Sequence, residues 1–570
     1  MCGIAAVSTC EAGGLDARAL VRDALQALRH RGPDATGISG SVQSCIGMCR
    51  LAVRGDVSIE VPFRSARAGH IRFAYNGEVY CAGIQGGGMI AVPRNGVEEA
   101  EALAGGGPVD GMFAMFERYA DGRIRARRDG LGIKPLFIRE HRLGVAAASE
   151  LRPLLSIFEQ PRIRSRAVAQ FLSFGRVLDG GTFYEGVRPV PAGSRVTIDR
   201  GRVTDVRAPE RHAVHAEPEC DAGTLRAAVT EAVRRCLVTD RPLGLAVSGG
   251  LDSTILAAEL SLLGVRDIET VSVLPVSSRD GVRNLSELCL PGHAWRTWRH
   301  HTVTFGPDDW LQSLRETAAC MGQPSSLTSD PLYGALGRLA GSAGVVVLLL
   351  GEGADELFAG YESYLSLGKL SRAAQFYSAH RDWSLLAALI GREATEAARE
   401  FLDHRVAEYS SPSVIDTIRA FEIEHSLQPL LTRADHLLMR SSVEGRVPFL
   451  HGRIPRLAWG ISSERLLQPS VTKSALRSAY ASLLPRQSTR RKIPFRPPMS
   501  AWLHGPLGER LAHVIHDGRE LLLEAGFQET GLRRLLAGMA ENDPSCHSLA
   551  PPIASLVAWL ISVRQAGYAD

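Results

Sequence analysis

The hydrophobic and polar positions follow two different patterns along the chain, and the change comes near residue 205. Before it, short apolar runs alternate with turn residues, as in IRFAYNGEVY, DGMFAMFERYADGRIRARRDG and GSRVTIDRGRVTDV. Apolar runs interrupted by Asp-Gly or Arg-Gly turns are typical of β-hairpins. One amphipathic helix is predicted at residues 17–31, where apolar residues recur at helical spacing. The first pattern therefore predicts a layered α+β domain.

After residue 223 the pattern becomes an alternation of helices and apolar strands. Helical runs (TLRAAVTEAVRRCLV, STILAAELSLLG) alternate with strand-like runs (PLGLAV, IETVSVLPV, GVVVLLLG). Such alternation indicates a parallel sheet. From about residue 365 long helical runs dominate, such as SLLAALIGREATEAAREFLDHRVAEY. The intervening segment 207–223 has little periodicity and is predicted to be an interdomain linker.

Length, composition and charge narrow the class of protein. The 570 residues exceed the roughly 250–300 that one core supports, so we expect two domains. A hydrophobic fraction of 45% and a charged fraction of 22% are ordinary for a soluble globular protein. The net charge of +4 is small and no basic stripe dominates, so we expect no nucleic-acid partner.

The cysteines and the apolar stretches indicate the cellular compartment in which we expect the protein. Ten cysteines, from Cys2 to Cys546, show no CxxC pair and no regular spacing, which indicates reduced thiols and a cytoplasmic protein. The start of the chain lacks a basic region followed by an apolar run, so no signal peptide is expected. The apolar stretch 343–351 is at most about half of a membrane span, which indicates a buried strand and no membrane partner.

A cysteine directly follows the initiator methionine. If Met1 is removed, Cys2 carries both a thiol and a free α-amine. An amine with a pKa near ~8 is partly neutral at pH 7 and can take the proton of the thiol. This arrangement predicts an N-terminal nucleophile. The alternative, which position alone favours, is that Cys2 is an ordinary small buried residue.

The stretch LGLAVSGGLDSTILAAEL predicts a phosphate-binding loop between a strand and a helix. Its glycines let backbone N–H groups point at an anion, and the helix N-terminus adds partial positive charge. Asp252 would repel phosphate unless it binds Mg²⁺. Because no GxxxxGK[ST] occurs, the loop is not a Walker A loop; it resembles the ATP loop of pyrophosphatase type, which cuts between the α and β phosphates. The alternative is a Gly-rich turn with a Ser cap.

A second apolar strand runs into an acidic, Gly-rich turn in LLLGEGADELFAGY. Its carboxylates are Glu352, Asp355 and Glu356, and crowding them without a cation is unfavourable. Open α/β sheets bind ligands at the carboxyl ends of their strands. Asp252 and Asp355 are therefore predicted as a pair of Mg²⁺ ligands. The alternative is that the acidic residues cap a helix, above all Glu356.

These motifs together resemble a known family. In order along residues 2–500 the chain contains MCGIAAV, RHRGPDATG, RLAVRG, YNGEVY, DGMFAMF, RRDGLGIKPLFI, ASELRPLL, SGGLDS, GEGADELFAGY and SSVEGRVPFL, and in this it resembles the glutamine-dependent asparagine synthetases. The resemblance implies an α+β N-terminal-nucleophile (Ntn) layered sandwich over 2–206, a glutaminase of the type-2 glutamine amidotransferases. After the linker 207–223 it implies an α/β adenine-nucleotide α-hydrolase-like ATP-pyrophosphatase domain over 224–570, with a parallel sheet and a helical C-terminal part.

For the first half, the resemblance implies that Cys2 is the glutaminase nucleophile, exposed by loss of Met1. Asn76 and Gly77 match the oxyanion-hole donors, an amide and a backbone N–H. Without the resemblance, Asn76-Gly77 would predict a hairpin turn. Arg50 would pair bidentately with the glutamine α-carboxylate. The positions that match glutamine-binding residues are Arg50, Leu51, Val53, Asn76, Gly77, Glu78 and Asp110, and the last two take the α-amine.

For the second half, the resemblance implies an ATP site with Mg²⁺. Lys473 matches a lysine that stabilises the adenylation transition state, although alone it reads as a solvated helix lysine. Glu352 is the candidate proton acceptor or amine-positioning carboxylate, and Arg446 is expected to be structural. The metal ligands would be Asp252 and Asp355. The positions that match ATP-binding residues are Ala246, Ser248, Gly249, Gly250, Asp252, Ser253, Val273, Leu350 and Gly351.

The sequence departs from the family at several points. His451 replaces an Asp, Leu350 a Ser and Cys81 an Asn, and none of these removes an assigned glutaminase or ATP-loop residue. The segment 277–305 differs more, and with 321–334 it lies near the acceptor pocket in the family. An acceptor other than aspartate is therefore open.

The predicted function is an ATP-dependent, glutamine-hydrolysing amidotransferase whose ammonia crosses an internal channel to an acyl-adenylate of a carboxylic acid such as L-aspartate. One alternative is amidation of another carboxylate in a natural-product pathway, and a second is a regulatory glutaminase-like protein with an inactive synthetase. The expected partners are glutamine, ATP and the acceptor acid, and a homodimer is left open. The basic tract 486–498 could contact phosphate or be a solvated face, and the solvated face is the favoured expectation.

Overall fold

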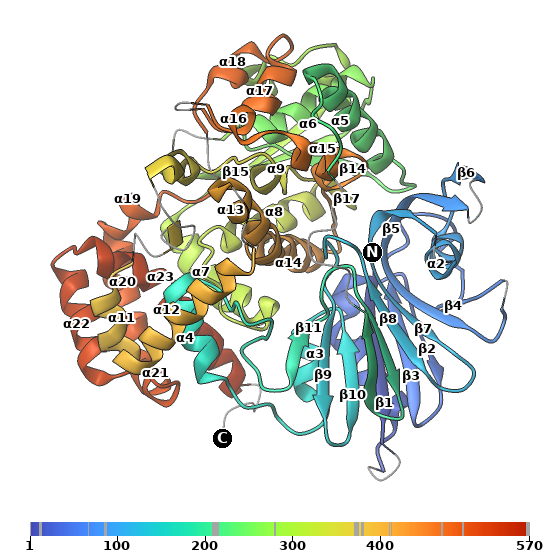
Figure 1. Ribbon diagram of the computed structural model, residues 1–570, viewed down its shortest axis with the longest axis horizontal. Coiled ribbons are helices and arrows are strands. Elements are labelled where there is room, and N and C mark those ends of the chain that lie inside the picture. The colour runs from blue at the N-terminus through green and yellow to red at the C-terminus, as the bar shows by residue number, and fades with distance from the viewer. Residues whose placement is uncertain are drawn as a thin grey trace.

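The computed structural model shows two lobes that meet near the N-terminus of the chain (Figure 1). The strands of the first 207 residues form one lobe, and the parallel sheet with most of the helices forms the other. The structure describes residues 2–10, 14–66, 68–84, 88–105, 107–207, 216–278, 281–369, 376–377, 381–409, 411, 413–468, 471–492 and 495–565.

The N-terminal lobe contains two antiparallel sheets, as predicted for a layered α+β domain. One sheet has the order β11 (Val187–Pro189), β9 (Phe137–His141), β10 (Gly144–Ala148), β1 (Cys2–Thr9), β3 (Ser44–Arg50) and β2 (Ala35–Gly40). The other has the order β13 (Arg202–Arg207), β12 (Arg195–Asp199), β8 (Ile124–Arg128), β7 (Val109–Arg118), β5 (Arg72–Ile84) and β4 (Phe63–Arg64), with β6 (Gly88–Ala91) beside β5.

Strand β1 is buried along its whole length because both of its faces are covered. Ala5 and Val7 pack in the same apolar cluster as helix α1 (Ala17–Ala27), the helix predicted from the helical spacing of apolar residues in 17–31. Ile4 and Ala6 pack on the opposite face, in the cluster between the two sheets. Alternate residues of a strand face opposite sides, so a strand with two covered faces reads as the continuous apolar run seen here.

The second lobe is built on a five-stranded sheet whose neighbouring strands are all parallel. Its order is β16 (Arg299–Phe305), β15 (Glu269–Pro275), β14 (Leu243–Ala246), β17 (Val347–Leu349) and β18 (Glu444–Arg446). The chain runs outward from β14 through β15 to β16 and then returns to the other side of β14. This reversal of strand order creates a crevice at the carboxyl ends of β14 and β17, where open α/β sheets bind ligands.

Helices surround this sheet and make up the C-terminal part, as predicted. The predicted helical run 384–409 is divided at Gly391, whose φ of +87° ends one helix. The helices of this lobe are α5 (Ala222–Cys236), α6 (Leu251–Leu262), α7 (Pro307–Met321), α8 (Asp330–Ser342), α9 (Ala354–Leu357), α11 (Trp383–Ile390), α12 (Arg392–Ala407), α13 (Val414–His425), α14 (Leu427–Met439), α15 (Ile454–Gly460), α16 (Ser463–Leu466), α17 (Ser474–Tyr480), α18 (Pro485–Thr489), α19 (Met499–Leu503), α20 (Pro506–Asp517), α21 (Arg519–Glu524), α22 (Glu529–Ala540) and α23 (Pro544–Gln565).

The remaining helical elements are short. The N-terminal lobe has α2 (Gly96–Ala104), α3 (Leu151–Ser156) and the 3₁₀ turn η2 (Arg29–Arg31). The second lobe has the 3₁₀ turns η3 (Leu285–Leu288), η4 (Ala294–Thr297), η5 (Glu362–Lys369) and η6 (Pro448–Leu450). Of the predicted linker 207–223, residues 208–215 lie outside the described residues, and Ala222 and Gly223 already belong to α5.

Helix α4 (Ser165–Phe174) belongs to the first half of the sequence but packs in the second lobe (Figure 1). It contacts α11, α12 and α23, and every residue from Ala167 to Phe174 is buried. Further on, Trp559 of α23 donates a hydrogen bond to the Tyr184 hydroxyl at 2.8 Å. The polypeptide therefore crosses to the other lobe before the main connection.

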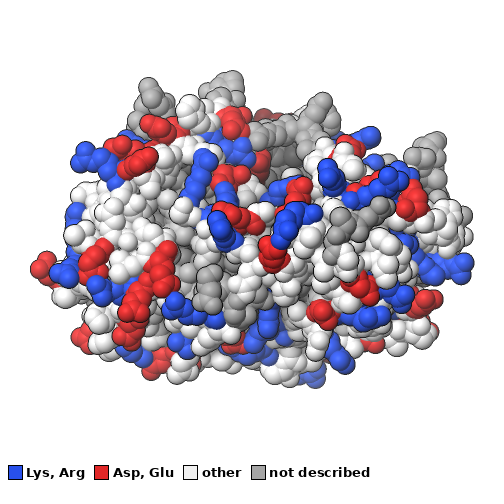
Figure 2. Space-filling model, turned by 90° about the horizontal axis from the view of Figure 1, so that it is seen from below, with Lys and Arg blue, Asp and Glu red and all other residues white. Residues whose placement is uncertain are grey.

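Three sequence expectations can be compared directly with the fold. All ten cysteines are free thiols, as expected. Among the described residues one helix, α23, has the length and composition to cross a membrane, and 78% of its apolar window is buried inside the molecule. On the face shown in Figure 2, basic and acidic side chains are intermixed without a large patch of one sign.

Candidate active sites

Cys2 lies at the start of the buried strand β1, opposite Arg50 of β3. Its side chain is 5% exposed, and its backbone N–H donates a hydrogen bond to Asn76 Oδ1 at 2.9 Å. Burial raises the pKa of the Cys2 thiol, while a backbone hydrogen bond from Leu51 and the charge of Arg50 act in the opposite direction. Cys2, the predicted nucleophile, is thus held in place by the pairing of β1 with β3.

Asn76 and Gly77 lie in the middle of strand β5, opposite Ala114 and Phe113 of β7. The hairpin turn that the Asn-Gly pair alone predicts is wrong. Gly77 has φ +139°, and a Cβ there would lie 1.9 Å from the carbonyl oxygen of Met112, so only glycine fits. The pair therefore marks a close approach of two strands.

The side chain of Asn76 is fully buried and only half satisfied. Its Oδ1 accepts from Cys2, and its Nδ2 has no hydrogen-bond partner among the described residues. An unpaired buried amide donor is costly, typically about 1–3 kcal/mol, unless a ligand uses it. A donor of this kind next to a nucleophile is what an oxyanion requires.

Arg50 is buried against its own loop. Its guanidinium donates to the carbonyl oxygens of Asp56 at 2.7 Å and Arg54 at 3.1 Å, and lies 5.5 Å from the centre of the Phe63 ring. It is 3% exposed. The loop that follows β3 is therefore closed around this arginine.

Leu51 and Val53 of the same loop pack against the second lobe. They form a small apolar cluster with Val347 of β17 and Met439 of α14. The predicted glutamine-binding loop thus packs against β17 and α14, the strand and the helix that also border the second site.

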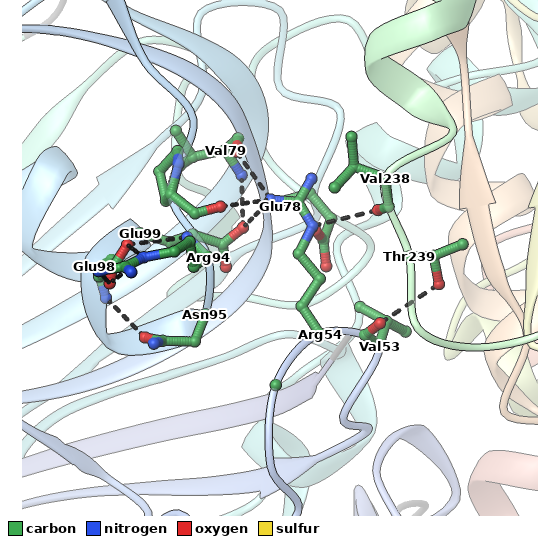
Figure 3. Close-up of polar contacts among 12 residues, drawn as sticks. Val53, Arg54, Glu78, Val79, Arg94, Asn95, Glu98, Glu99, Val238 and Thr239 are labelled. Atoms are coloured by element: carbon green, nitrogen blue, oxygen red, sulfur yellow. Dashed lines mark hydrogen bonds and ion pairs between the residues drawn. The ribbon is translucent and has the colours of Figure 1, made fainter.

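Glu78 lies in a buried network of charges that joins the two lobes (Figure 3). Its Oε2 is 3.0 Å from Arg54 Nε and 3.4 Å from Arg446 Nη2. Arg54 also donates to Glu99 Oε1 of α2 at 3.2 Å and to the Val238 carbonyl at 3.1 Å. Burial raises the pKa of Glu78, and the nearby charge of Glu444 acts in the same direction.

Two arginines therefore already engage the Glu78 carboxylate. Arg446 was expected to be structural, and its guanidinium donates to the carbonyls of Cys236 and Val238, both at 2.8 Å. Sequence reasoning missed Arg54 and Glu99. Arg54 lies in the quoted RLAVRG motif, but nothing local marks its partner on α2.

Asp110 faces the second lobe. Its Oδ2 accepts from Arg235 Nη1 at 2.9 Å, its Oδ1 accepts from the Gly452 N–H at 3.1 Å, and His451 Nδ1 lies 3.5 Å away. Burial acts to raise the pKa of Asp110, but these partners outweigh it and lower the pKa to about 2. The departure at His451 thus places a partner opposite a predicted glutamine-binding residue.

The second site is a cavity of about 410 Å³ at the carboxyl ends of β14 and β17. All the residues predicted for adenylation line it: Ala246, Ser248, Gly249, Gly250, Asp252, Ser253, Val273, Leu350, Gly351, Glu352, Asp355 and Lys473. The structure therefore brings together positions that lie up to 227 residues apart, because adjacent parallel strands end at the same edge.

The loop after β14 turns directly into helix α6. Gly249 has φ +79°, and a hydrogen bond of 3.2 Å from the Ser248 N–H to Ser253 Oγ closes the turn. No side chain caps the N-terminus of this 12-residue helix. The Gly-rich turn and the uncapped helix start form an anion-binding arrangement.

Lys473 lies between the two predicted metal ligands. Its Nζ is 2.6 Å from both oxygens of Asp252 and 2.7 Å from Asp355 Oδ1. Burial acts against the charge, but the two carboxylates raise the pKa of Lys473 and keep it an ammonium. Despite burial, Lys473 and Lys492 lower the pKa of Asp355.

The backbone of Gly360 leaves the room that this cluster needs. A Cβ at Gly360 would lie 2.0 Å from Asp355 Oδ1 and 2.1 Å from Lys473 Cε. Lys473 itself has φ +55°, at the start of α17. The contact between Asp355 and Lys473 therefore depends on a residue without a Cβ at Gly360 and on the left-handed backbone of Lys473.

The two carboxylates fit a magnesium ion that arrives with phosphate. They offer oxygen ligands from two strand ends around a position where a cation, the Lys473 ammonium, already lies. Among the described residues no group of three or more His, Cys, Asp or Glu side chains could hold a metal. Mg²⁺ commonly takes one or two carboxylates and completes its shell with phosphate and water, so this donor set suits it.

Glu356 does not cap helix α9, which has no side-chain cap. Its carboxylate accepts a hydrogen bond from the Tyr361 hydroxyl. Burial raises the pKa of Glu356 to about 8, and the charge of Asp355 acts in the same direction. Glu356 is thus a neutral acid at pH 7 beside the charged cluster.

Glu352 lies on the wall of the cavity with two partners, one of which, Arg433, the sequence did not indicate. It accepts from Arg433 Nη2 at 2.8 Å and from the Tyr333 hydroxyl. The guanidinium of Arg433 also donates to Ser329 Oγ at 2.7 Å and lies 3.9 Å from the centre of the Tyr333 ring. Arg433 is an interior position of α14, where no local motif marks it.

The segments singled out around the cavity behave differently. None of the described residues of 277–305 lines it, because this segment forms η3, η4 and the edge strand β16 and packs on α6, whereas residues 326–329 and Tyr333 of the segment 321–334 do line it. The basic tract 486–498, expected to be a solvated face, is solvated only in part: several of its arginines are exposed, but it also contributes wall residues, which are Gln487, Arg490, Arg491, Lys492, Phe495 and Arg496. The charge pattern alone did not show that the tract folds back over the sheet edge.

Helix α14 stands between the two sites. It carries Arg433 on the cavity wall, and two residues later Asp435 accepts from Arg31 Nη2 at 2.7 Å. Arg31, fully buried, also donates from Nε to the Cys2 carbonyl at 3.2 Å and from Nη1 to Glu150 at 2.8 Å. Helix α14 is therefore connected to the Cys2 strand through Arg31 and also contributes to the cavity wall.

Comparisons with known proteins find matches for both halves of the chain. The model of the asparagine synthase family matches residues 224–561, and that of the glutamine amidotransferase domain matches 1–83 and 104–209. Asparagine synthetase (glutamine-hydrolysing) 1 of Bacillus subtilis (strain 168) is 26% identical, with 91% of this chain and 90% of that protein covered. Asparagine synthetase (glutamine-hydrolysing) of Cricetulus griseus is 25% identical, with 67% of this chain and 72% of that protein covered.

Proposed function

The chain belongs to the asparagine synthase family, whose model covers more than half of it, and from this premise we propose that it is a glutamine-hydrolysing, ATP-dependent amide ligase. The observation that carries the proposal is the cluster of Asp252, Lys473 and Asp355 in a molecule that also holds Cys2 against Asn76. A regulatory protein with an inactive synthetase would have no use for this intact cluster. We propose the division into 2–206, the linker 207–223 and 224–570.

In the glutaminase reaction, loss of Met1 leaves the Cys2 α-amine beside its thiol, and the amine takes the thiol proton. The thiolate attacks the side-chain amide carbon of glutamine. The developing oxyanion accepts from Asn76 Nδ2, which has no partner among the described residues, and from the Gly77 N–H. The amine returns its proton to the leaving nitrogen, ammonia departs, and water hydrolyses the thioester to glutamate.

In the adenylation reaction, an oxygen of the acceptor carboxylate attacks the α-phosphorus of ATP and pyrophosphate leaves. The loop Ser248–Ser253 holds the phosphates, and the adenosine lies against Ala246, Val273, Leu350 and Gly351. The Lys473 ammonium stabilises charge that grows on the phosphate oxygens. Asp252 and Asp355 would hold Mg²⁺, which when bound neutralises the triphosphate.

In the amidation step, ammonia attacks the acyl carbon, AMP leaves, and the amine loses a proton. Glu352 positions the ammonia or accepts the proton that the amine loses. It lies on the cavity wall, and α14 connects that wall to the Cys2 strand through Arg31. A closed path between the lobes keeps the ammonia from being protonated in bulk water. We propose L-aspartate as the acceptor, following the names of the relatives. The ten free thiols support a cytoplasmic enzyme.

The test is pyrophosphate release with ATP, Mg²⁺ and glutamine, with and without L-aspartate, read together with product mass. Pyrophosphate that depends on aspartate, with asparagine formed, supports the proposal. Glutaminase activity without it would instead indicate another acceptor, and a panel of carboxylic acids then finds it. No pyrophosphate with any acid would overturn the ligase assignment.

A further inference from the structure

We propose that Arg54 and Asp240 are positioning residues for the glutaminase reaction, because they dock the loop that orients Arg50 onto the second lobe. This loop (residues 51–56, the Arg50 loop) follows β3, and the docking segment (residues 238–240) lies between α5 and β14. The inference rests on the proposed glutaminase function, with Arg50 as the group that binds the glutamine α-carboxylate. Neither Arg54 nor Asp240 is among the positions that the family resemblance assigns.

The backbone of the Arg50 loop sets the direction of the Arg50 guanidinium. Its Nη1 donates to the carbonyl oxygen of Asp56 at 2.7 Å, and its Nη2 donates to that of Arg54 at 3.1 Å. A guanidinium carries five N–H donors in a rigid fork, so two bonds to one loop fix its plane and leave further donors for a carboxylate. A shift of the loop would therefore turn the fork away from the α-carboxylate.

The side chain of Arg54 fastens this loop from inside the molecule (Figure 3). It is 5% exposed, so its contacts are shielded from water. Its Nη1 donates to the carbonyl of Val79 at 3.3 Å and to Glu99 at 3.2 Å, and its Nε lies 3.0 Å from Glu78. Its Nε also donates to the carbonyl of Val238 at 3.1 Å. One buried side chain thus ties the loop to β5, to α2 and to the docking segment.

Further hydrogen bonds join the Arg50 loop to the docking segment directly. The Val53 carbonyl accepts from the Asp240 N–H at 2.9 Å and from Thr239 Oγ1 at 3.3 Å. In the other direction, the Gly55 N–H donates to Asp240 Oδ2 at 2.8 Å. Gly55 has φ +70°, which suits a residue without a Cβ at this turn. The loop is therefore held at its turn by a side chain of the second lobe.

Asp240 and Arg50 bind opposite ends of one peptide group. The Arg54 carbonyl, which accepts from Arg50, and the Gly55 N–H, which donates to Asp240, belong to the same peptide unit. A trans peptide is planar, and its C=O and N–H point in opposite directions, so a rotation of this plane would strain both bonds together. Asp240, an exposed residue of the second lobe, thus fixes the orientation of an acceptor that Arg50 uses.

The docking segment is itself held firmly by the second lobe. The carbonyl of Val238 accepts from Arg446 Nη1 at 2.8 Å. The carbonyl of Pro242, just after the segment, accepts from the N–H groups of Val346 and Val347 at 3.0 and 3.1 Å. Val347 is the first residue of β17, so the docking segment is anchored to the parallel sheet. The orientation of Arg50 therefore depends on a fixed part of the synthetase lobe.

The first experiment measures kcat and KM for glutamine hydrolysis, as glutamate released without ATP. Asp240→Ala removes the acceptor of the Gly55 N–H, so KM should rise ~10-fold, while kcat stays at the wild-type value because Cys2 and its strand are untouched. Asp240→Asn keeps an acceptor oxygen and should restore KM to within ~2-fold of the wild type. Asp403→Ala, which removes an exposed carboxylate of α12, is the matched control and should not change KM.

Arg54→Lys tests the second positioning residue. It keeps a positive charge beside Glu78 and Glu99 but loses the fork that also reaches Val238, so KM should again rise ~10-fold with little change in kcat. If Arg54→Lys does not fold, the exposed Asp240 pair of variants decides the inference without it.

The second experiment measures hydrogen exchange in the peptide that contains Gly55, which reads the docking without any reaction. Exchange should be ~10-fold faster in Asp240→Ala than in the wild type and unchanged in Asp240→Asn. Faster exchange with an unchanged KM would overturn the inference, as would the same KM in the wild type and Asp240→Ala or the same loss in both Asp240 variants. A wild type that hydrolyses no glutamine would overturn the proposed glutaminase and the inference together, whereas wild-type hydrolysis that no variant alters overturns the inference alone.

Discussion

The two sites of this protein are prepared in different ways. Around Cys2 the groups are fixed by strand register: β1 pairs with β3, and Asn76 accepts from the Cys2 backbone in a fully buried setting. Around Lys473 the groups are side chains of opposite charge that neutralise one another in an open cavity of about 410 Å³. As we propose their functions, the first site needs the loss of one residue, Met1, whereas the second needs a ligand that separates its charges.

This difference predicts which activity each kind of substitution should affect. A change in the strand-built site removes one chemical group and leaves the cavity as it is. A change in the charged cluster alters the partners of all its members, because Asp355 Oδ1 is shared by two lysines. Variants of the first site should therefore lose only the use of glutamine, while variants of the second should lose amidation from any nitrogen source.

The largest effect is expected for Cys2→Ala. Glutamine-dependent amide formation should fall ~10³-fold or more because the nucleophile is lost, while ammonium-dependent formation stays at the wild-type rate. Amide formation is measured by product mass with each nitrogen source. Cys289→Ala, which removes an exposed thiol, is the control. An equal loss with both nitrogen sources would erase the distinction between the sites.

Lys473→Met should lower adenylation ~10²–10³-fold, because it removes a cation from the developing phosphate charge. Glutaminase activity, measured as glutamate released without ATP, should remain. The paired readouts are pyrophosphate release and glutamate release on the same preparation. Loss of both activities would mean that the cluster also supports the glutaminase lobe, contrary to the comparison above.

Gly360→Ala should have an effect of ~10²-fold on adenylation without removing any charge. The added Cβ would lie 2.0 Å from Asp355 Oδ1 and 2.1 Å from Lys473 Cε, and displacements of about 1 Å can cost this much. Gly130→Ala, at a position with open space around it and no left-handed backbone, controls for the substitution itself. Wild-type pyrophosphate release by Gly360→Ala would show that the cluster tolerates movement.

The smallest effect concerns pH. Glu356, with its pKa raised to about 8, is neutral below that pH and gains a negative charge beside Asp355 above it. That charge repels phosphate, so ATP–pyrophosphate exchange should fall ~3-fold between pH 7 and pH 9. Glu356→Gln cannot ionise and should show a flatter profile. A parallel fall in both proteins would assign the pH dependence to another group.

The sequence predicted the parts of the fold that depend on local pattern. The strand–loop–helix pattern around Asp252 and the acidic turn at Asp355 predicted that the two residues share one site. They do line one cavity, because parallel strands place their carboxyl ends together. Without the family resemblance, the Asn76-Gly77 pair would predict a hairpin turn, which is wrong. Its local preference is overridden by two strands that approach closely.

The parts that escaped prediction depend on long-range packing. Arg433 reaches the cavity because α14 packs against α8, and it lies in no motif, whereas Tyr333 of α8 belongs to the segment 321–334 that was expected near the acceptor pocket. The basic tract was read as solvated since charge runs usually are, yet Lys492 finds its partner 137 residues earlier in the chain. Such pairings leave no local signal in a single sequence.

Helix α4 has a consequence for how the enzyme can be divided. Eight consecutive buried residues of the glutaminase half complete the core around α11, α12 and α23. If the chain were cut between the halves, the two fragments would stay bound to each other. If either half were expressed alone, it would expose an apolar surface that the missing half normally covers. The catalytic halves are thus interlocked pieces of one folding unit, and neither can be exchanged for a foreign domain without transplanting this helix or replacing its contacts.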